Sequence, residues 1–174
     1  FNITDFKQTC REVMAQQEKL VVVINDPCHN PTGYSLTEAE WKEVISFLNE
    51  CGKQMPVVLL NDIAYIDYSY DIIHSRDYME QFNAISENVI IVIAFSCSKS
   101  LTSYGLRCGA ALIMGQNAED VRNVEVVFEK AARATWSNIA NAAMDNFTAV
   151  TSDHLAAYNK EKAGYVELLK QRSD

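Results

Sequence analysis

Residues 89–95 read Val-Ile-Ile-Val-Ile-Ala-Phe, and residues 57–60 read Val-Val-Leu-Leu. With the earlier run Val-Val-Val-Ile at residues 21–24, they are three short stretches that are apolar at every position. A strand without polar alternation is buried on both faces, which is typical of a parallel sheet covered on both sides by helices. We therefore predict an α/β fold, built as a three-layer sandwich around a mostly parallel sheet.

Two amphipathic helices are predicted before the second of these strands in the chain. Apolar residues recur at helical spacing between Thr4 and about Gln17, which predicts the first helix. Thr37 and Glu40 form a capping box that starts the second helix, and we expect Gly52 to follow its last turn. The core-facing positions of the second helix are predicted to be Trp41, Val44, Ile45 and Leu48.

The chain after Phe95 departs from the parallel pattern. Residues 96–109 are all that separate Phe95 from the next apolar run, Ala110 to Met114, and they include two glycines. A parallel connection needs a crossover of about a dozen residues or more, usually a helix. We therefore expect this strand to run antiparallel to its predecessor. From Ala118 onward the sequence predicts two helical stretches with a break around residues 135–138.

Composition narrows the class of protein. The 174 residues are 48% hydrophobic and carry 15 Lys and Arg against 23 Asp and Glu, a net charge of −8. Such an acidic chain is not expected to bind nucleic acid, whose phosphates attract basic surfaces. Its longest apolar run is the length of a strand, so no membrane-spanning segment is expected. The chain opens at Phe1 rather than Met and shows no signal peptide, so we expect a segment of a longer protein.

Cysteine usage points to a reducing compartment. The chain has five cysteines and no Cys-x-x-Cys pair. An odd number of scattered cysteines does not fit a disulfide framework or a zinc site. We predict free thiols in a cytoplasmic protein, with no bound metal.

Polar clusters follow each of the three predicted parallel strands. They are His29-Asn-Pro-Thr-Gly33, Asn61-Asp-Ile-Ala-Tyr65 and Ser96-Cys-Ser-Lys99, and Arg107 lies in the next loop. The carboxyl ends of parallel strands meet at one edge of the sheet, where ligands bind. A lysine amine can form a Schiff base, a buried carboxylate can keep a pyridine nitrogen protonated, and arginine and serine suit a phosphate dianion. This inventory suits a phosphorylated cofactor that carries an aldehyde and a basic ring nitrogen.

Each cluster alone also has an ordinary structural explanation. Asp62 could serve as a turn residue or helix cap, and Lys99 as a solvated loop lysine. Asn-Pro-Thr-Gly is common in turns. The order and spacing of the three clusters, taken together, favour a binding site for a ligand.

In these motifs the sequence resembles the class I/II aminotransferases of the fold-type I pyridoxal-phosphate enzymes. The resemblance spans most of the chain in the family's order, and the Ser-x-Ser-Lys…Gly-x-Arg-x-Gly element is highly specific. The Cys-His-Asn-Pro-Thr-Gly version is most similar to the aspartate and aromatic branches. The matching stretches are residues 28–33, 62–65, 96–109 and Arg133-Ala-Thr-Trp-Ser-Asn138.

The resemblance implies catalytic and cofactor-binding roles for single residues. Lys99 is similar to the lysine that forms the Schiff base with pyridoxal phosphate and then moves the proton at the substrate Cα. Asp62 matches the partner of the ring nitrogen, while Asn30 and Tyr65 match the donors to the cofactor's 3′-oxygen. The predicted catalytic residues are therefore Lys99, Asp62 and Tyr65. The remaining cofactor-binding positions implied are Ala64, packed against the ring, and Ser96, Ser98 and Arg107 at the phosphate.

Arg133 is a predicted substrate-binding residue. In the aspartate branch, an arginine in this motif reaches the neighbouring subunit's site and selects dicarboxylates, which implies a homodimer. Here Trp136 stands where tyrosine is more usual. The alternative is a surface arginine at a helix end.

The resemblance also implies a domain organisation and a reaction. Residues 1–174 would be the central and C-terminal part of the large, cofactor-binding domain, with exit helices from Ala140 to Asp174 and no small domain. A glycine-rich phosphate loop, a ring that stacks on the cofactor and an arginine for the substrate carboxylate are not found in the sequence. The expected reaction is transamination between an amino acid and a 2-oxo acid, with the isolated chain inactive. The alternatives are another fold-type I activity, such as a C–S lyase or a cyclopropane-carboxylate synthase, or a non-catalytic binding fragment.

Overall fold

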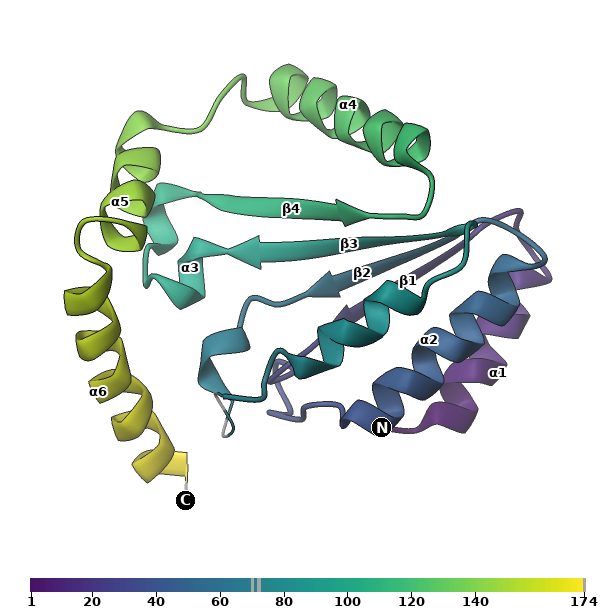
Figure 1. Cartoon of the computed structure of the whole chain (residues 1–174), viewed down its shortest axis with the longest axis horizontal. Helices are drawn as coiled ribbons and strands as arrows, with labels where there is room; N and C mark the ends of the chain where they lie inside the picture. Colours follow the sequence, from purple (N-terminus) through teal and green to yellow (C-terminus); the bar gives the residue numbers. More distant parts are fainter. Residues whose placement is uncertain (70, 72, 174) are drawn as a thin grey trace.

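A single four-stranded sheet organises the structure, a computed structural model that describes residues 1–69, 71 and 73–173. The strands follow the chain in space, in the order β1 (Leu20–Asn25), β2 (Val57–Asp62), β3 (Val89–Ser96) and β4 (Gly109–Met114) (Figure 1). Strands β1 to β3 are parallel, and β4 runs antiparallel to β3. The predicted α/β fold with a mostly parallel sheet and one antiparallel strand is confirmed.

Helices precede, connect and follow these strands. The two predicted N-terminal helices are present, and the capping box of Thr37 and Glu40 starts the second of them. The helices are α1 (Ile3–Met14), α2 (Glu38–Gly52), α3 (Cys97–Ser100), α4 (Ala118–Thr135), α5 (Asn141–Thr151) and α6 (Leu155–Ser173). Short 3₁₀ segments are η1 (Ile66–Tyr68), η2 (Asp77–Ala84) and η3 (Tyr104–Leu106).

The chain after residue 118 forms three helices, so the prediction of two was wrong. The break after Thr135 lies where the sequence predicts it. A second break follows Thr151, whose hydroxyl donates to the Phe147 carbonyl oxygen, while the Ser152 hydroxyl donates to that of Thr148. Such bonds from serine and threonine to the preceding turn compete with helix continuation.

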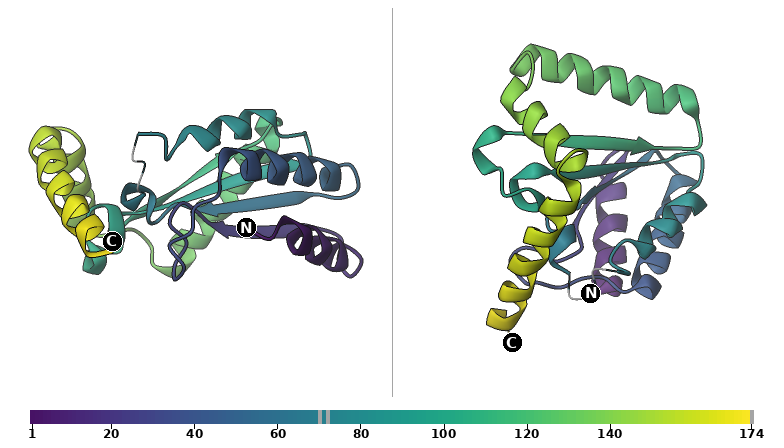
Figure 2. Two further views of the ribbon diagram at one scale, coloured as in Figure 1. Left: turned by 90° about the horizontal axis from the view of Figure 1, so that it is seen from below. Right: turned by 60° about the vertical axis from the view of Figure 1, so that its left-hand side comes forward.

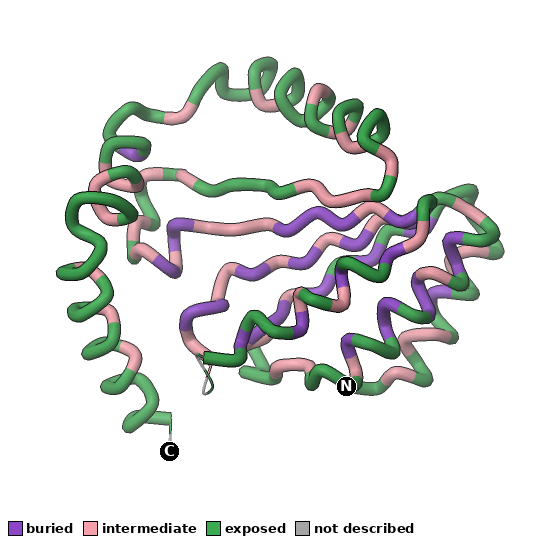
Figure 3. Tube along the Cα trace, viewed as in Figure 1, coloured by how far each residue is buried: buried purple, intermediate pink, exposed green. Residues whose placement is uncertain are grey.

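The core lies between one face of the sheet and α2 with η2. Trp41 of α2 is fully buried, stacks on Tyr78 with ring centroids 4.7 Å apart and meets Phe82 edge-on at 5.6 Å. The predicted core positions of α2 are all buried, namely Trp41, Val44, Ile45 and Leu48. Figure 3 shows that burial concentrates in β1 to β3 and α2, whereas α4 and α6 contain no buried residue.

Gly52 lies inside the last turn of α2, so its predicted place after that turn was wrong. The cap residue is Lys53, in an ordinary right-handed helical conformation. A Cβ at Gly52 would lie 3.0 Å from Ser86 Oγ and 3.1 Å from Val89 Cγ2. The glycine therefore serves close packing of the helix end against β3, not a left-handed turn.

The second face of the sheet is open at β1, where the apolar run predicts cover on both faces. Val21 and Val23 are 52% and 65% exposed, while Leu20, Val22 and Ile24 between them are buried. Helix α1 does not cover these valines but packs beside α2, where Lys7 Nζ lies 2.6 Å from Glu43 Oε1.

Among the described residues, no helix is long and apolar enough to span a membrane.

Candidate functional site

The three parallel strands deliver the predicted polar clusters to one edge of the sheet. Asn25 at the end of β1 is the register partner of Asp62 at the end of β2, and Asp62 in turn pairs with Ala94 of β3. Helices α3, α5 and α6 lie beyond this edge (Figures 1 and 2). The loop that carries Asn30 begins here.

Asn30 and Tyr65 are in direct contact although 35 residues separate them. Asn30 Nδ2 donates to Tyr65 Oη across 3.1 Å. Both polar groups therefore lie at one point, where they can serve one ligand atom together.

Lys99 lies on the short helix α3 and faces two phenol rings. Its Nζ is 5.4 Å from the ring centroid of Tyr65 and 4.6 Å from that of Tyr104. The Lys99 carbonyl oxygen accepts a 2.8 Å hydrogen bond from Tyr68 Oη. Burial above all raises the pKa of Tyr68, so this phenol stays protonated and keeps donating at neutral pH. The lysine is thus placed beside the Asn30–Tyr65 pair.

Asp62 turns its carboxylate toward its own loop. Its Oδ1 accepts from the backbone N–H of Ala64 across 3.0 Å, and both residues are half-buried. This turn holds the carboxylate at the end of β2 and places the small Ala64 side chain next to it.

Arg107 meets Ser98 across the loop between β3 and β4. Arg107 Nη1 donates to Ser98 Oγ at 3.3 Å and to the Tyr104 carbonyl oxygen at 2.9 Å. The backbone of Arg107 is left-handed, with φ 53°, a conformation that non-glycine residues rarely adopt and that clusters at binding sites. Ser96 caps α3, with its hydroxyl oxygen accepting from the Ser98 N–H. The guanidinium and the Ser98 hydroxyl are therefore adjacent donors suited to an oxyanion.

Arg133 lies elsewhere, exposed in the last turn of α4. Its guanidinium donates to the Ser137 carbonyl oxygen at 3.4 Å. Figure 1 shows α4 on the side of β4 that faces away from β3, and the hydrogen bond given for Arg133 does not reach any residue around Lys99.

Three residues of this site are absent from the sequence prediction. Tyr68 and Tyr104 contact Lys99, and Asn25 links the Asn30 loop to β2. A signal for Asn25 exists in the sequence, because it ends the first apolar run as Asn61 and Asp62 end the second. The two tyrosines lie in the short 3₁₀ segments η1 and η3, whose geometry does not follow from residue periodicity.

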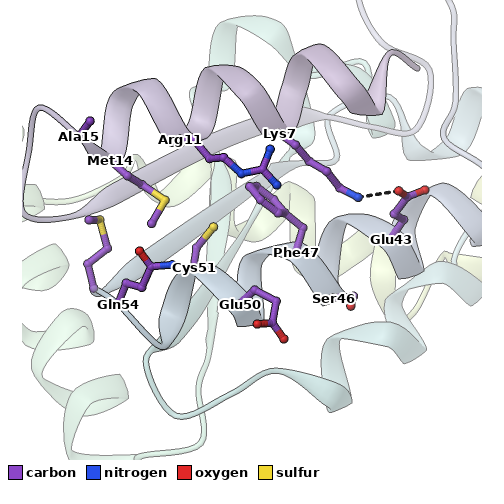
Figure 4. A pocket seen from close by; sticks show the side chains of 11 residues that line it. Lys7, Arg11, Met14, Ala15, Glu43, Ser46, Phe47, Glu50, Cys51 and Gln54 are labelled. Atoms are coloured by element: carbon purple, nitrogen blue, oxygen red, sulfur yellow. Dashed lines mark hydrogen bonds and ion pairs between the residues drawn. The ribbon is translucent and has the colours of Figure 1, made fainter.

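A cavity of about 660 Å³ lies apart from this cluster, between α1 and α2. Figure 4 shows Arg11 reaching toward the Phe47 ring, with its guanidinium carbon 5.3 Å from the ring centroid. Lys7 and Glu43 pair across the same groove. The residues that line this cavity include none of the predicted site residues.

Comparison with known proteins identifies the family. Residues 2–174 match the family described as aminotransferase class I and II. The chain is 27% identical over 134 residues to the mitochondrial aspartate aminotransferase of Gallus gallus, covering 77% of this chain and 30% of that protein. It is 28% identical over 117 residues to the aromatic-amino-acid aminotransferase of Pseudomonas aeruginosa, covering 67% of this chain and 28% of that protein. The chain thus spans about 30% of the length of these curated relatives.

Solved structures agree with this comparison. An aminotransferase from Anaerococcus prevotii matches with a TM-score of 0.95 and 36% identity, covering all of this chain and 43% of that one. The aromatic-amino-acid aminotransferase of Burkholderia pseudomallei, described as covalently bound to pyridoxal phosphate, shares the fold with a TM-score of 0.73 and 23% identity. That match covers 95% of this chain and 41% of that one. The family depends on pyridoxal phosphate, and this chain belongs to the class I and II aminotransferases.

Proposed function

We propose that this chain supplies the lysine-bearing part of a pyridoxal-phosphate site in an enzyme that transfers amino groups between amino acids and 2-oxo acids. One observation carries the proposal: the Lys99 amine lies 5.4 Å from the ring of Tyr65, whose hydroxyl is hydrogen bonded to Asn30. An amine that can bond to an aldehyde therefore lies beside two polar groups that converge on one point.

The residues present fit the chemistry of the cofactor. Lys99 would provide the amine for the covalent link, and Asp62 would hold the ring nitrogen protonated. Asn30 and Tyr65 would hold the 3′-oxygen. When bound, the protonated ring draws electrons from the substrate Cα. The phosphate would be held by Ser96 and Arg107, with Ser98 as a further candidate next to Arg107.

The finer statements also belong to this proposal. We place residues 1–174 in the central and C-terminal part of a large cofactor-binding domain, in a cytoplasmic homodimer. Arg133, exposed at the end of α4, would then act toward a neighbouring subunit and not toward its own Lys99. The relatives act, by name, on aspartate and aromatic amino acids, which are our first candidate donors.

Reductive trapping tests the proposal. The purified chain is incubated with pyridoxal phosphate over a range of concentrations, reduced with borohydride and mapped by peptide mass spectrometry. We expect Lys99 to be labelled at lower cofactor concentration than the exposed Lys42, Lys53 and Lys130. The variant Lys99→Arg keeps the charge but offers no amine, so it should lose the first labelled site. Labelling spread evenly over the lysines would overturn the assignment.

A further inference from the structure

Asn25 joins two parts of the site through both ends of its side-chain amide. Its Oδ1 accepts from the backbone N–H of Asn30 across 2.8 Å. Its Nδ2 donates to the backbone carbonyl oxygen of Asp62 across 3.1 Å. One half-buried side chain thus ties the start of the Asn30 loop to the end of β2.

This bridge fixes where the Asn30 backbone lies relative to β2. Asn30 is exposed, and its own amide donates to Tyr65. Its backbone N–H is held by Asn25, five residues earlier. Asp62 is the register partner of Asn25, so the strand pairing places the bridging amide opposite the carboxylate residue.

We infer that Asn25 is a positioning residue, which holds Asn30 at the distance from Asp62 that a pyridine ring with a 3′-oxygen requires. This inference rests on the proposed function and deepens it. Asn25 bonds to backbone atoms of the two residues, so it acts through them and not on the ligand. Removing the Asn25 side chain leaves the side chains of Asn30 and Asp62 unchanged, but it releases the backbone of the Asn30 loop from β2.

Asn49 offers a matched control elsewhere in the fold. Its Oδ1 accepts from the Ser86 N–H at 2.8 Å, and its Nδ2 donates to the Ala84 carbonyl oxygen at 2.8 Å. It is half-buried like Asn25 and bridges two backbone groups in the same manner, away from the strand ends that carry the site. A general loss of stability should therefore follow from Asn49→Ala as much as from Asn25→Ala.

The experiment compares the 174-residue chain with the variants Asn25→Ala, Asn25→Asp and Asn49→Ala. Amide hydrogen exchange measures whether the Asn30 N–H is held, without any cofactor. We expect exchange at Asn30 to quicken about tenfold in Asn25→Ala and to stay slow in Asn25→Asp, whose carboxylate still accepts that hydrogen bond. The concentration of pyridoxal phosphate that half-labels Lys99 should rise about tenfold in Asn25→Ala and stay unchanged in Asn49→Ala.

The outcomes separate this inference from the proposal on which it rests. If Lys99 is not selectively labelled in the parent chain, the proposed function fails and takes the inference with it. If the parent is labelled but Asn25→Ala and Asn49→Ala behave alike, the inference alone is overturned. Unchanged exchange at Asn30 in Asn25→Ala would also overturn it. Urea unfolding of each variant shows whether the two alanine substitutions cost comparable stability.

Discussion

Lys162 of α6 lies 2.6 Å from Oδ2 of Asp67, a carboxylate of η1 that is only 8% exposed. The other carboxylate oxygen of Asp67, Oδ1, lies 2.7 Å from Arg76 Nη2. Burial alone would raise the pKa of Asp67, but the hydrogen bond and charge of Lys162, together with the hydrogen bond from Arg76, hold that pKa below its usual range. The ionised trio fastens α6 to the segment that follows Tyr65, beside the edge where the parallel strands end.

Removing Lys162 should loosen α6. We expect Lys162→Ala to cost about 1.5–3 kcal/mol in the free energy of unfolding, because a largely buried charged hydrogen bond is lost. Deuterium uptake in α6 should increase while that of β2 stays unchanged. The exposed Lys160, two residues earlier, provides the control, and Lys160→Ala should change neither quantity. Equal uptake in all three proteins would show that this ion pair does not anchor the helix.

Asp26, a second buried carboxylate, has a raised pKa where Asp67 has a lowered one. Its contribution to folding stability should therefore change with pH in the opposite direction. Asp26 is 1% exposed and accepts from Trp41 Nε1 at 2.8 Å and from the Leu36 N–H at 2.7 Å. Burial raises the pKa of Asp26 above its ordinary value despite these two hydrogen bonds. The folded chain therefore binds this proton more tightly than the unfolded chain, so this group's stabilisation declines as the pH rises from about 3.8 through the folded pKa.

The variant Asp26→Asn isolates this contribution because its side chain does not titrate. We expect the substitution to destabilise the protein, since the new NH₂ group must face one of two N–H donors. The difference in unfolding free energy between parent and variant should be largest near the ordinary pKa of about 3.8 and shrink toward neutral pH. Urea titrations at several pH values measure it, and a difference that grows with pH would contradict the raised pKa.

Much of this architecture follows from local sequence, for identifiable reasons. The strands β1 to β3 are apolar over most of their length, and the short connection from β3 to β4 cannot hold a crossover, so pairing and direction were predictable. The polar residues at strand ends were predictable as one cluster because parallel strands end at one edge. That convergence predicts that Asn30 and Tyr65 lie near one edge, whereas the hydrogen bond between them depends on the geometry of the two loops.

Other features depend on contacts between distant segments. The bridge from Asn25 to Asp62 exists only because the register of β1 and β2 makes them partners. Lys162 reaches Asp67 because α6 returns to the strand ends, which helical periodicity does not specify. The close packing at Gly52 involves Ser86 and Val89, which are distant in the sequence. The residues next to Gly52 carry no sign of this packing and predict only an ordinary helix end.

Gly109 is predicted to tolerate no side chain. A Cβ there would lie 2.6 Å from the Phe95 carbonyl oxygen, a backbone atom of the neighbouring strand. We expect Gly109→Ala to destabilise the chain by about 1–3 kcal/mol, the usual cost of overpacking, and to separate β4 from β3 near Arg107. Gly105, in η3 just before β4, has open space around its Cβ position, so Gly105→Ala should be nearly neutral. Thermal unfolding of the two variants decides this, and equal melting temperatures would refute the close approach.

The final prediction concerns what the 174-residue chain can do alone. It presents Lys99, Asp62, Asn30, Tyr65 and Arg107 at one edge, yet spans only 43% of the Anaerococcus prevotii enzyme. By resemblance, the glycine-rich phosphate loop, the stacking ring and the arginine for the substrate carboxylate belong to parts of the family outside this segment. Each charged hydrogen bond contributes about 1.5–3 kcal/mol, so losing two weakens cofactor binding by at least about a hundredfold.

We therefore expect the chain to trap pyridoxal phosphate at Lys99 only at high cofactor concentration and to transaminate neither aspartate nor aromatic donors. Without a carboxylate clamp, the substrate Cα is not held where the Lys99 amine could move its proton. A longer protein that contains this chain and the remaining family segments should do both. Steady-state assays of the two proteins with the same donors provide the measurement. Turnover by the 174-residue chain at the rate of the longer protein would mean that the other segments are dispensable, and that substrate is held by residues of this chain that we have not assigned.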